Sequence, residues 1–217
     1  MEVLEFSLMY LNIYQVYYKM FRNICLIGLP TAGKTRVGKL LFQHLNMGFI
    51  DTDDLIRQKY NRELPELITQ FGNKGFLDME TEVIQSLNHQ NVVLSTGGSV
   101  IHREKSMDHI KNVLKSDVYH LFLSKRIFLE RMNKSKEKEI IINKDQSLTD
   151  LYNERMVQYD VHSDFIIKAC DKVHLDSFKP YDYWSPTEGA KGEKEPIIMY
   201  TNKDKHSNTG SRFSPPL

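Results

Sequence analysis

The sequence predicts an α/β domain in which helices wrap a parallel sheet. Short apolar runs alternate along the chain with longer stretches of helical periodicity, and a glycine-rich turn after the first run opens directly into a helical stretch. The runs expected to form strands are residues 23–27, 48–51, 92–95, 118–123 and 165–168. The helical stretches are residues 34–45, 54–60, 64–71, 75–88, 103–114, 125–132 and 147–159. Strands joined by helical crossovers predict a three-layer domain with a five-stranded parallel sheet.

The regular pattern occupies residues 20–172, which we expect to form one domain. Residues 1–19 carry an apolar stretch that polar residues interrupt, too short to span a bilayer and without the basic start of a secretory signal, so we expect an N-terminal extension. From Val173 the pattern stops, and prolines fall among Gly, Ser, Lys and Asn. This composition predicts a loosely ordered or disordered tail over residues 173–217.

Charge and cysteine content narrow the class of partner. Among 217 residues, 29 Lys plus Arg against 28 Asp plus Glu give a formal net charge of +1, so we expect neither a nucleic-acid nor a membrane partner. Cys25 and Cys170 cannot form a disulfide framework, which indicates a reducing compartment and a cytoplasmic location. We expect both to be small buried apolar residues. The length suffices for a core of its own, and we expect a monomer.

A phosphate-binding loop follows the first strand. Residues 28–35 read Gly-Leu-Pro-Thr-Ala-Gly-Lys-Thr, which matches GxxxxGK[ST] between a strand and a helix. In such a loop backbone N–H groups hold phosphate, the lysine bridges the outer phosphates and the threonine hydroxyl binds Mg²⁺. The residues expected to bind ATP here are Gly28, Ala32, Gly33, Lys34 and Thr35, with Thr35 also on the metal. The alternative is a glycine turn that contains Lys-Thr by coincidence. The strand and helix on either side favour a P-loop NTPase-type domain.

Three carboxylates follow the second strand. Asp51, Asp53 and Asp54 fall at the carboxyl edge of the sheet, where ligands of open α/β folds bind. One carboxylate near Mg²⁺ can hold a metal-bound water, and a second can take the proton of an acceptor hydroxyl. Helix capping is the alternative, and it explains Asp54 better than the other two. We therefore favour a functional role for Asp51 and Asp53.

A glycine pair follows the third strand. Gly97 and Gly98 would let the backbone approach a ligand with its N–H groups available as donors. By itself this pair is equally consistent with an ordinary turn.

Together the three motifs resemble the shikimate kinase family, over about residues 20–172. The resemblance implies a small P-loop kinase with a mobile lid that closes over ATP and transfers the γ-phosphate to the 3-hydroxyl of shikimate, a small hydroxy acid. It implies that Asp51 holds the water shell of Mg²⁺. Asp53 would bind the acceptor hydroxyls and act as the base, beside Lys34 as the other catalytic residue, and the glycine pair would contact the acceptor.

The resemblance extends to the lid and a later helix. Residues 129–138 occupy the place of the family's basic, mobile segment, so Arg131 and Lys138 are expected to contact ATP. Lys138 begins Lys-Glu-Ile-Ile where the family has Arg-Pro-Leu-Leu, and a lysine lacks the bidentate fork of an arginine. A solvated charged loop is the plainer interpretation of this stretch. Arg155 matches the family arginine that grips the substrate carboxylate.

The sequence departs from the family in three places, of which the first bears on the acceptor. Leu77 stands where the family has an arginine, although Lys74, one turn earlier, could fill the gap. Ser99 replaces the third glycine, and the family's C-terminal helix after the fifth strand has no counterpart in the pattern. Two alternatives to shikimate phosphorylation therefore stay open. One is a kinase of the same fold for another polyol or hydroxy acid such as gluconate, and the other is a nucleotide-binding protein without transfer activity.

Overall fold

The strands form one sheet with the parallel core that the sequence predicts. A computed structural model describes residues 22–135, 140–168 and 200–201. Its strands are β1 (Asn23–Ile27), β2 (Gly48–Asp51), β3 (Val92–Ser95), β4 (Ser116–Phe122), β5 (Phe165–Lys168) and β6 (Tyr200–Thr201). They lie in the order β2-β3-β1-β4-β5-β6. The first five strands are parallel, and only β6 pairs antiparallel, with β5.

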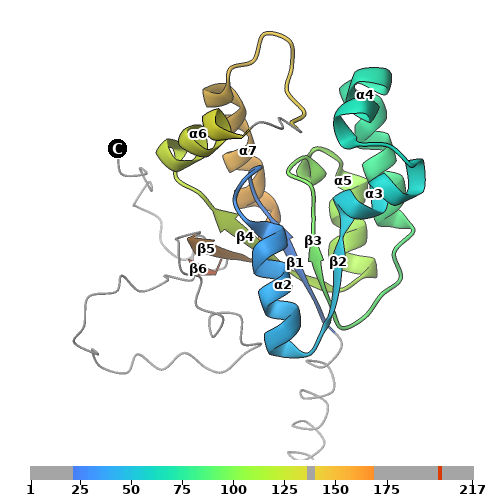
Figure 1. Cartoon of the computed structure of the whole chain (residues 1–217). Helices are drawn as coiled ribbons and strands as arrows, with labels where there is room; N and C mark the ends of the chain where they lie inside the picture. Colours follow the sequence, from blue (N-terminus) through green and yellow to red (C-terminus); the bar gives the residue numbers. More distant parts are fainter. Residues whose placement is uncertain (1–21, 136–139, 169–199, 202–217) are drawn as a thin grey trace, which may run out of the picture.

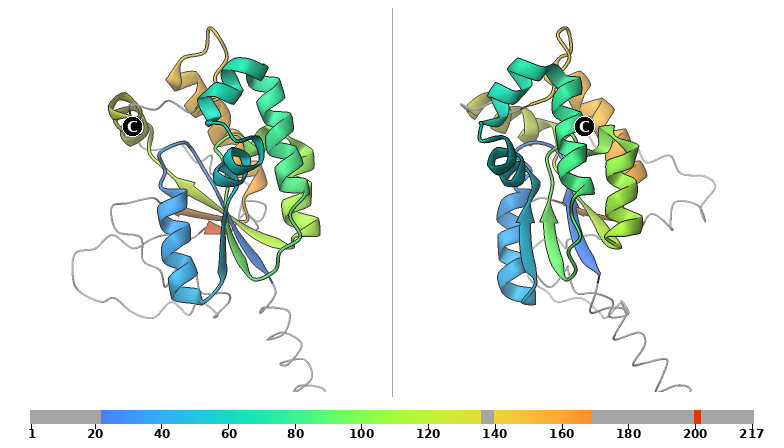
Figure 2. Two further views of the ribbon diagram at one scale, coloured as in Figure 1. Left: turned by 45° about the vertical axis from the view of Figure 1, so that its right-hand side comes forward. Right: turned by 90° about the vertical axis from the view of Figure 1, so that its right-hand side faces the viewer.

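Helices cover both faces of this sheet (Figures 1 and 2). They are α2 (Lys34–Leu45), α3 (Thr52–Tyr60), α4 (Leu64–Gln85), η1 (Val100–His102), α5 (Glu104–Asp108), the π-helical turn η2 (His109–Val113), α6 (Lys125–Lys134) and α7 (Leu148–His162). With the sheet seen edge-on, in the right-hand view of Figure 2, α2 lies on one side and α5 on the other. The predicted three-layer α/β architecture is thereby confirmed. In the part of the chain described, no helix has the length and apolar character to cross a membrane.

The elements differ from the predicted ones in a few places. Strand β4 begins at Ser116 rather than at residue 118, because its first two residues extend the ladder with β1. The two helices expected at 64–71 and 75–88 are one helical stretch broken at Gly72, whose φ of 68° favours glycine. The helix expected at 103–114 is α5 followed by the π-helical turn. The strand β6 lies in the stretch predicted to be tail.

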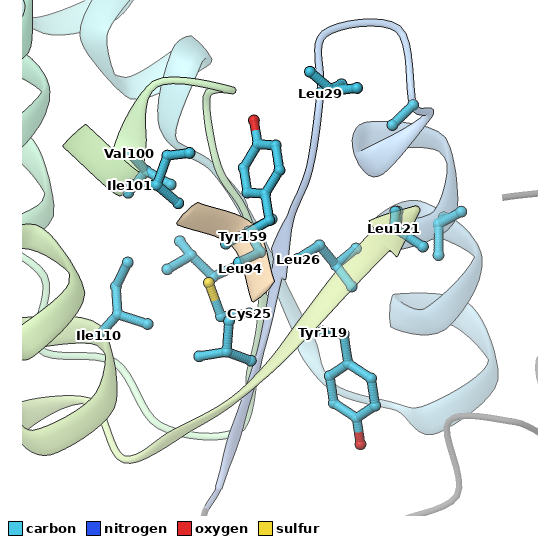
Figure 3. Close-up of a cluster of buried hydrophobic side chains, with 14 of the residues drawn as sticks. Cys25, Leu26, Leu29, Leu94, Val100, Ile101, Ile110, Tyr119, Leu121 and Tyr159 are labelled. Atoms are coloured by element: carbon cyan, nitrogen blue, oxygen red, sulfur yellow. The ribbon is translucent and has the colours of Figure 1, made fainter. Parts of the chain in front are cut away.

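The main core lies between the sheet and the helices on its faces. Figure 3 shows part of it, with Leu26 and Leu94 from the central strands and the Tyr159 ring beside them. Cys25 is fully buried, and burial raises the pKa of its thiol, which confirms the prediction of a buried apolar residue. Cys170 lies outside the described residues, as does the place expected for a C-terminal helix.

A second, smaller core joins α3 to α4. Its buried side chains are Ile56, Leu64, Leu67, Phe76 and Val83. This packing fixes one face of α4 beside the start of α3, at the carboxyl edge of β2 and β3. The loops that follow β1, β2 and β3 therefore meet along one edge of the sheet (Figure 1).

Candidate active site

The loop between β1 and α2 is folded around the side chain of its own lysine. Lys34 Nζ donates hydrogen bonds to the backbone oxygens of Gly28, at 2.8 Å, and Leu29, at 3.0 Å. Gly33 precedes α2 with a φ of 92°, a conformation that costs glycine little. Burial lowers the pKa of Lys34 to about 8, although the nearby Asp53, Asp51 and Glu80 oppose this shift. The loop thus holds a cation beside the positive end of α2, an arrangement suited to binding an anion.

Helix α6 is tied to the same loop by Arg131. Its Nη1 donates a hydrogen bond of 2.8 Å to the backbone oxygen of Thr31, whose φ of 65° is unusual for a β-branched residue. Arg131 therefore lies against the phosphate loop, as a residue that contacts nucleotide phosphates would. Lys138, the other lid residue predicted to contact ATP, lies outside the described residues.

The first turn of α2 meets the end of β2. Thr35 Oγ1 donates a hydrogen bond of 2.8 Å to Asp51 Oδ2. The other oxygen of Asp51 accepts from the backbone N–H of Asp53 at 3.1 Å, so Asp51 caps α3. Capping therefore falls to Asp51 rather than to Asp54, which forms an exposed ion pair with Arg57.

A hydroxyl and a carboxylate side by side fit a magnesium ion. Oxygen ligands from Thr35 and Asp51 are the kind that Mg²⁺ prefers, and Mg²⁺ commonly takes one or two protein ligands and completes its shell with water and substrate phosphates. Within the described ranges no group of three or more His, Cys, Asp or Glu could hold a metal by itself. A metal at Thr35 and Asp51 would complete its shell with water and bound phosphate.

Two carboxyl groups converge on Gly97. A Cβ built at Gly97 would lie 2.5 Å from Glu80 Oε1 and 2.9 Å from Asp53 Oδ1. A side chain at this position would clash with both groups, so their approach requires glycine. The backbone N–H of Gly97 donates to Thr52 Oγ1 at 3.1 Å, which fixes the loop after β3 against the start of α3.

An arginine borders the next residue of this loop. Arg155 Nη1 donates to the backbone oxygen of Gly98 at 3.1 Å, and Nη2 donates to that of Ile141 at 2.6 Å. The Tyr159 hydroxyl donates to the same Gly98 oxygen at 2.7 Å. Figure 3 shows this hydroxyl at the end of the ring farthest from Cys25. Helix α7 thus holds the glycine pair through two side chains, and Arg155 is only 2% exposed.

We call the following residues the polar cluster: Asp53, Glu80, Gly97, Gly98, Ser99 and Arg155. The structure brings together Asp53, Arg155 and the glycine pair, as the sequence predicts. It also brings in Glu80, which the sequence analysis missed, and Ser99, which it noted only as a departure. Ser99 Oγ donates to Glu80 Oε2 at 2.9 Å. One signal for Glu80 was available, since it is an acidic residue at helical spacing from apolar residues that are buried, Phe76, Leu77, Val83 and Ile84.

Charge is unevenly distributed in the polar cluster. Burial, together with the nearby Asp53, raises the pKa of Glu80 to about 8, against the opposing effects of Ser99, Arg155 and Lys34. Leu77 is buried on the same helix and brings no charge. Lys74 is exposed, and its backbone oxygen accepts a hydrogen bond of 3.4 Å from Arg103 Nη2.

Known proteins resemble this chain in sequence and in structure. The family model described as shikimate kinase matches residues 30–180. A shikimate kinase of Thermodesulfovibrio yellowstonii is 31% identical over 149 residues, which span 67% of this chain and 84% of that protein. A shikimate kinase of Bacillus cereus strain AH187 is 32% identical over 124 residues, 57% of this chain and 74% of that protein.

Solved structures agree with the sequence matches. The shikimate kinase from Acinetobacter baumannii in complex with shikimate superposes with a TM-score of 0.65 at 27% identity, covering 74% of this chain and 90% of that one. The shikimate kinase from Aquifex aeolicus superposes with a TM-score of 0.59 at 28% identity, covering 71% of this chain and 90% of that one. The fold, the phosphate loop and these matches agree over most of the described residues. The chain therefore belongs to the shikimate kinase family, whose members are phosphotransferases that use ATP and act on an alcohol.

Proposed function

We propose that this protein transfers the γ-phosphate of ATP to the 3-hydroxyl of shikimate in the presence of Mg²⁺. One observation carries the proposal: Lys34, the Thr35–Asp51 pair and Asp53 meet at one edge of the sheet, and Arg155 lies beyond them at Gly98. A nucleotide bound at the loop would place its outer phosphate between the cation and the carboxyl groups. An acceptor with a hydroxyl and a carboxylate fits the remaining part of the site.

The phosphate loop handles ATP. Its backbone N–H groups and the positive end of α2 would hold the inner phosphates, and Gly28, Ala32 and Gly33 allow this close approach. On binding, the ammonium of Lys34 would exchange its two carbonyl partners for phosphate oxygens, where it neutralises developing charge. Arg131 would contact the nucleotide from α6.

The metal site is formed by Thr35 and Asp51. Thr35 would bind Mg²⁺ through its hydroxyl, and Asp51 would hold a water of the metal shell. When bound, Mg²⁺ neutralises charge on the phosphates. The 2.8 Å hydrogen bond between the two side chains holds both oxygens in place before the metal arrives.

Asp53 acts as the base of the transfer. Its carboxylate accepts the proton of the acceptor hydroxyl, whose oxygen forms a bond to the γ-phosphorus. The bond from that phosphorus to the β–γ bridging oxygen breaks, and ADP leaves with the bridging oxygen. Backbone groups of Gly97 and Gly98 position the acceptor beside Asp53.

Arg155 binds the acceptor carboxylate. In the ligand-free site its two terminal nitrogens donate to neutral backbone oxygens. A carboxylate accepts stronger, charge-assisted hydrogen bonds and would displace these contacts. The same guanidinium donates to the backbone oxygen of Ile141, a few residues after the lid segment. Acceptor binding and the position of the lid would therefore depend on the same side chain.

A coupled assay of ADP release tests the proposal. The full chain is assayed with Mg-ATP and shikimate, gluconate or no acceptor, and the product of any active acceptor is identified by phosphorus NMR. We expect release that requires shikimate and yields the 3-phosphate. Release only with gluconate would establish the other-acceptor alternative that Leu77 favours. Nucleotide binding without release under any condition would establish the non-catalytic one.

Leu77→Arg is expected to tighten binding of shikimate. A charge-assisted hydrogen bond to a carboxylate contributes on the order of 1.5 to 3 kcal/mol, so restoring one should lower KM for shikimate by about 10- to 150-fold. Steady-state kinetics at saturating ATP measure this change. Lys74→Ala is the matched variant, because Lys74 is the other cation on this part of α4. If Lys74 already fills the gap, Lys74→Ala should raise KM and Leu77→Arg should change little. No activity in either variant or in the wild type would reject shikimate as the acceptor.

We propose further that the active unit spans residues 20–172 and works as a cytoplasmic monomer. The net charge of +1 gives no reason to expect a polyanionic partner, and the buried, unpaired Cys25 is compatible with a reducing compartment. Residues 1–19 would be an extension and residues 173–217 a tail. Size-exclusion chromatography with light scattering tests the monomer.

A further inference from the structure

Glu80 presents an unpartnered oxygen to the polar cluster. Glu80 is only 1% exposed, and its Oε2 accepts the hydrogen bond from Ser99 Oγ. Its Oε1 is buried and has no hydrogen-bond partner among the described residues. No Lys, Arg or His of the described chain forms an ion pair with it either. An ionised carboxylate in this setting carries a large desolvation cost.

Two departures from the family meet at this carboxyl group. Leu77 lies three residues before Glu80 on α4, and residues at that spacing are neighbours on a helix surface. A cation at position 77 would stand beside Glu80 and favour its ionised form, whereas leucine gives it no counter-charge. Ser99, in the place of a glycine, supplies one hydroxyl donor to Oε2. That single hydrogen bond from a neutral donor leaves Oε1 without a hydrogen-bond partner among the described residues.

Burial and the neighbouring carboxylate of Asp53 also disfavour an ionised Glu80. Its Oε1 and Asp53 Oδ1 both approach Gly97, so a second negative charge would repel the first. Burial and Asp53 raise the pKa of Glu80 from its ordinary 4.5 to about 8, while Arg155 of α7 and Lys34 of α2 act against them. The other elements packed against α4 carry further titratable groups, namely Asp54, Arg57, Lys59 and Tyr60 of α3, His102 of η1, Glu104, Lys105 and Asp108 of α5, and His109 and Lys111 of η2.

We propose that Glu80 is a specificity-determining residue that stays protonated and donates a hydrogen bond from Oε1 to an oxygen of the acceptor. This inference rests on the proposed function and deepens it. A neutral carboxylic acid takes the place of a second cation, so the site binds the acceptor through the guanidinium of Arg155 and the carboxylic acid of Glu80. When Glu80 loses its proton, Oε1 can only accept a hydrogen bond, and its charge repels an acceptor carboxylate.

The acceptor KM should therefore depend on pH through Glu80. For the wild type at saturating ATP we expect KM for shikimate to rise above about pH 8, approaching tenfold for each further pH unit. Glu80→Gln is the matched variant, because an amide keeps a donor and does not titrate. Its KM for shikimate should lack this rise. A wild-type KM that stays flat up to pH 9.5, or a parallel rise in Glu80→Gln, would overturn the proposal.

Leu77→Arg gives a second kinetic comparison. An arginine at position 77 should pair with Glu80, favour its ionised form and itself bind the acceptor carboxylate, so the rise in KM above pH 8 should disappear in this variant. If the rise persists unchanged in Leu77→Arg, the leucine does not control the proton on Glu80, and the proposal is wrong on that point.

Protonation of Glu80 can also be tested without activity, from stability. A carboxyl group whose pKa is raised on folding contributes stability that is complete below its unfolded pKa and is lost as pH rises through its folded pKa. Between about pH 5 and 8, the folding equilibrium constant of Glu80→Gln relative to that of the wild type should therefore increase by up to tenfold per pH unit. Above that range this gap in stability between the two proteins should stay constant. Urea unfolding of the ligand-free protein at each pH measures this gap.

Glu82→Gln controls for the loss of a carboxylate on the same helix. Glu82 is exposed and pairs with Lys59, which lowers its pKa, so its gap to the wild type should not grow between pH 5 and 8. A constant gap for Glu80→Gln would mean that Glu80 is ionised in the folded protein and would overturn the proposal whatever the acceptor is. If the gap grows but no acceptor-dependent ADP release is found, Glu80 is protonated in the folded protein. The proposed function is then wrong, and so is the role of Glu80 as a donor to the acceptor.

Discussion

Lys34→Ala is expected to abolish phosphoryl transfer, a loss of at least ~10³-fold, while the fold stays intact. The ammonium is held inside the phosphate loop by two backbone oxygens, so the charge is in position before the nucleotide binds. Its main contribution comes when negative charge develops on the γ-phosphate, and alanine leaves that charge uncompensated. Single-turnover ADP release measures the loss, and circular dichroism with a thermal melt verifies the fold.

Lys39→Ala is the matched control for this prediction. Lys39 lies on the same helix, α2, and its side chain is exposed, so its removal takes away one positive charge without touching the loop. Transfer in Lys39→Ala should stay close to the wild-type rate. Transfer at near wild-type rate in Lys34→Ala as well would show that residues 28–35 do not bind the reacting phosphate.

Local sequence signals predicted the parallel sheet well. Four of its strands have the predicted limits, because each is a short apolar run closed by a turn residue or a polar stretch. Strand β4 is longer than its apolar run. Ser116 and Asp117 are polar but pair with Asn23 and Ile24, and Asp117 also forms an ion pair of 2.7 Å with Arg22. This extension depends on a neighbouring strand more than 90 residues away, which a local pattern cannot reveal.

The residues of the candidate site were predicted where they belong to a motif. Lys34, Thr35 and Asp51 follow from loop chemistry and from the common edge of parallel strands. Glu80 was missed because its role depends on a contact with Gly97 across the loop after β3. The contact of Arg155 with Ile141 likewise depends on how the chain returns from the lid segment. Contacts of this kind are set by tertiary packing rather than by residue spacing.

The Arg-to-Leu departure at position 77 and the Gly-to-Ser departure at position 99 looked independent in the sequence. In the structure both positions bear on Glu80, one as the absent counter-charge and the other as the hydroxyl donor. They therefore describe one change in how the acceptor site handles charge. In our proposal, the acceptor question raised by Leu77 therefore depends on the protonation state of Glu80.

Asp53→Asn is expected to lower kcat by at least ~100-fold, the usual scale for loss of a positioned base. Asparagine keeps the size and the position beside Gly97 but is a far weaker proton acceptor than a carboxylate. The capping bond comes from the backbone N–H of Asp53 and survives the substitution, so the start of α3 should be unchanged. KM for ATP should change little, because ATP contacts the loop and the metal site instead.

Asp54→Asn separates this effect from the general loss of a carboxylate at the start of α3. Asp54 is the next residue along, is 58% exposed and pairs with Arg57 on the surface, so its substitution should leave kcat near the wild-type value. A fall in kcat alone in Asp53→Asn identifies the base. A loss of ATP binding as large as the loss of kcat would instead place Asp53 on the metal. The division of roles between Asp51, which is held by Thr35, and Asp53, which faces Gly97, would then be wrong.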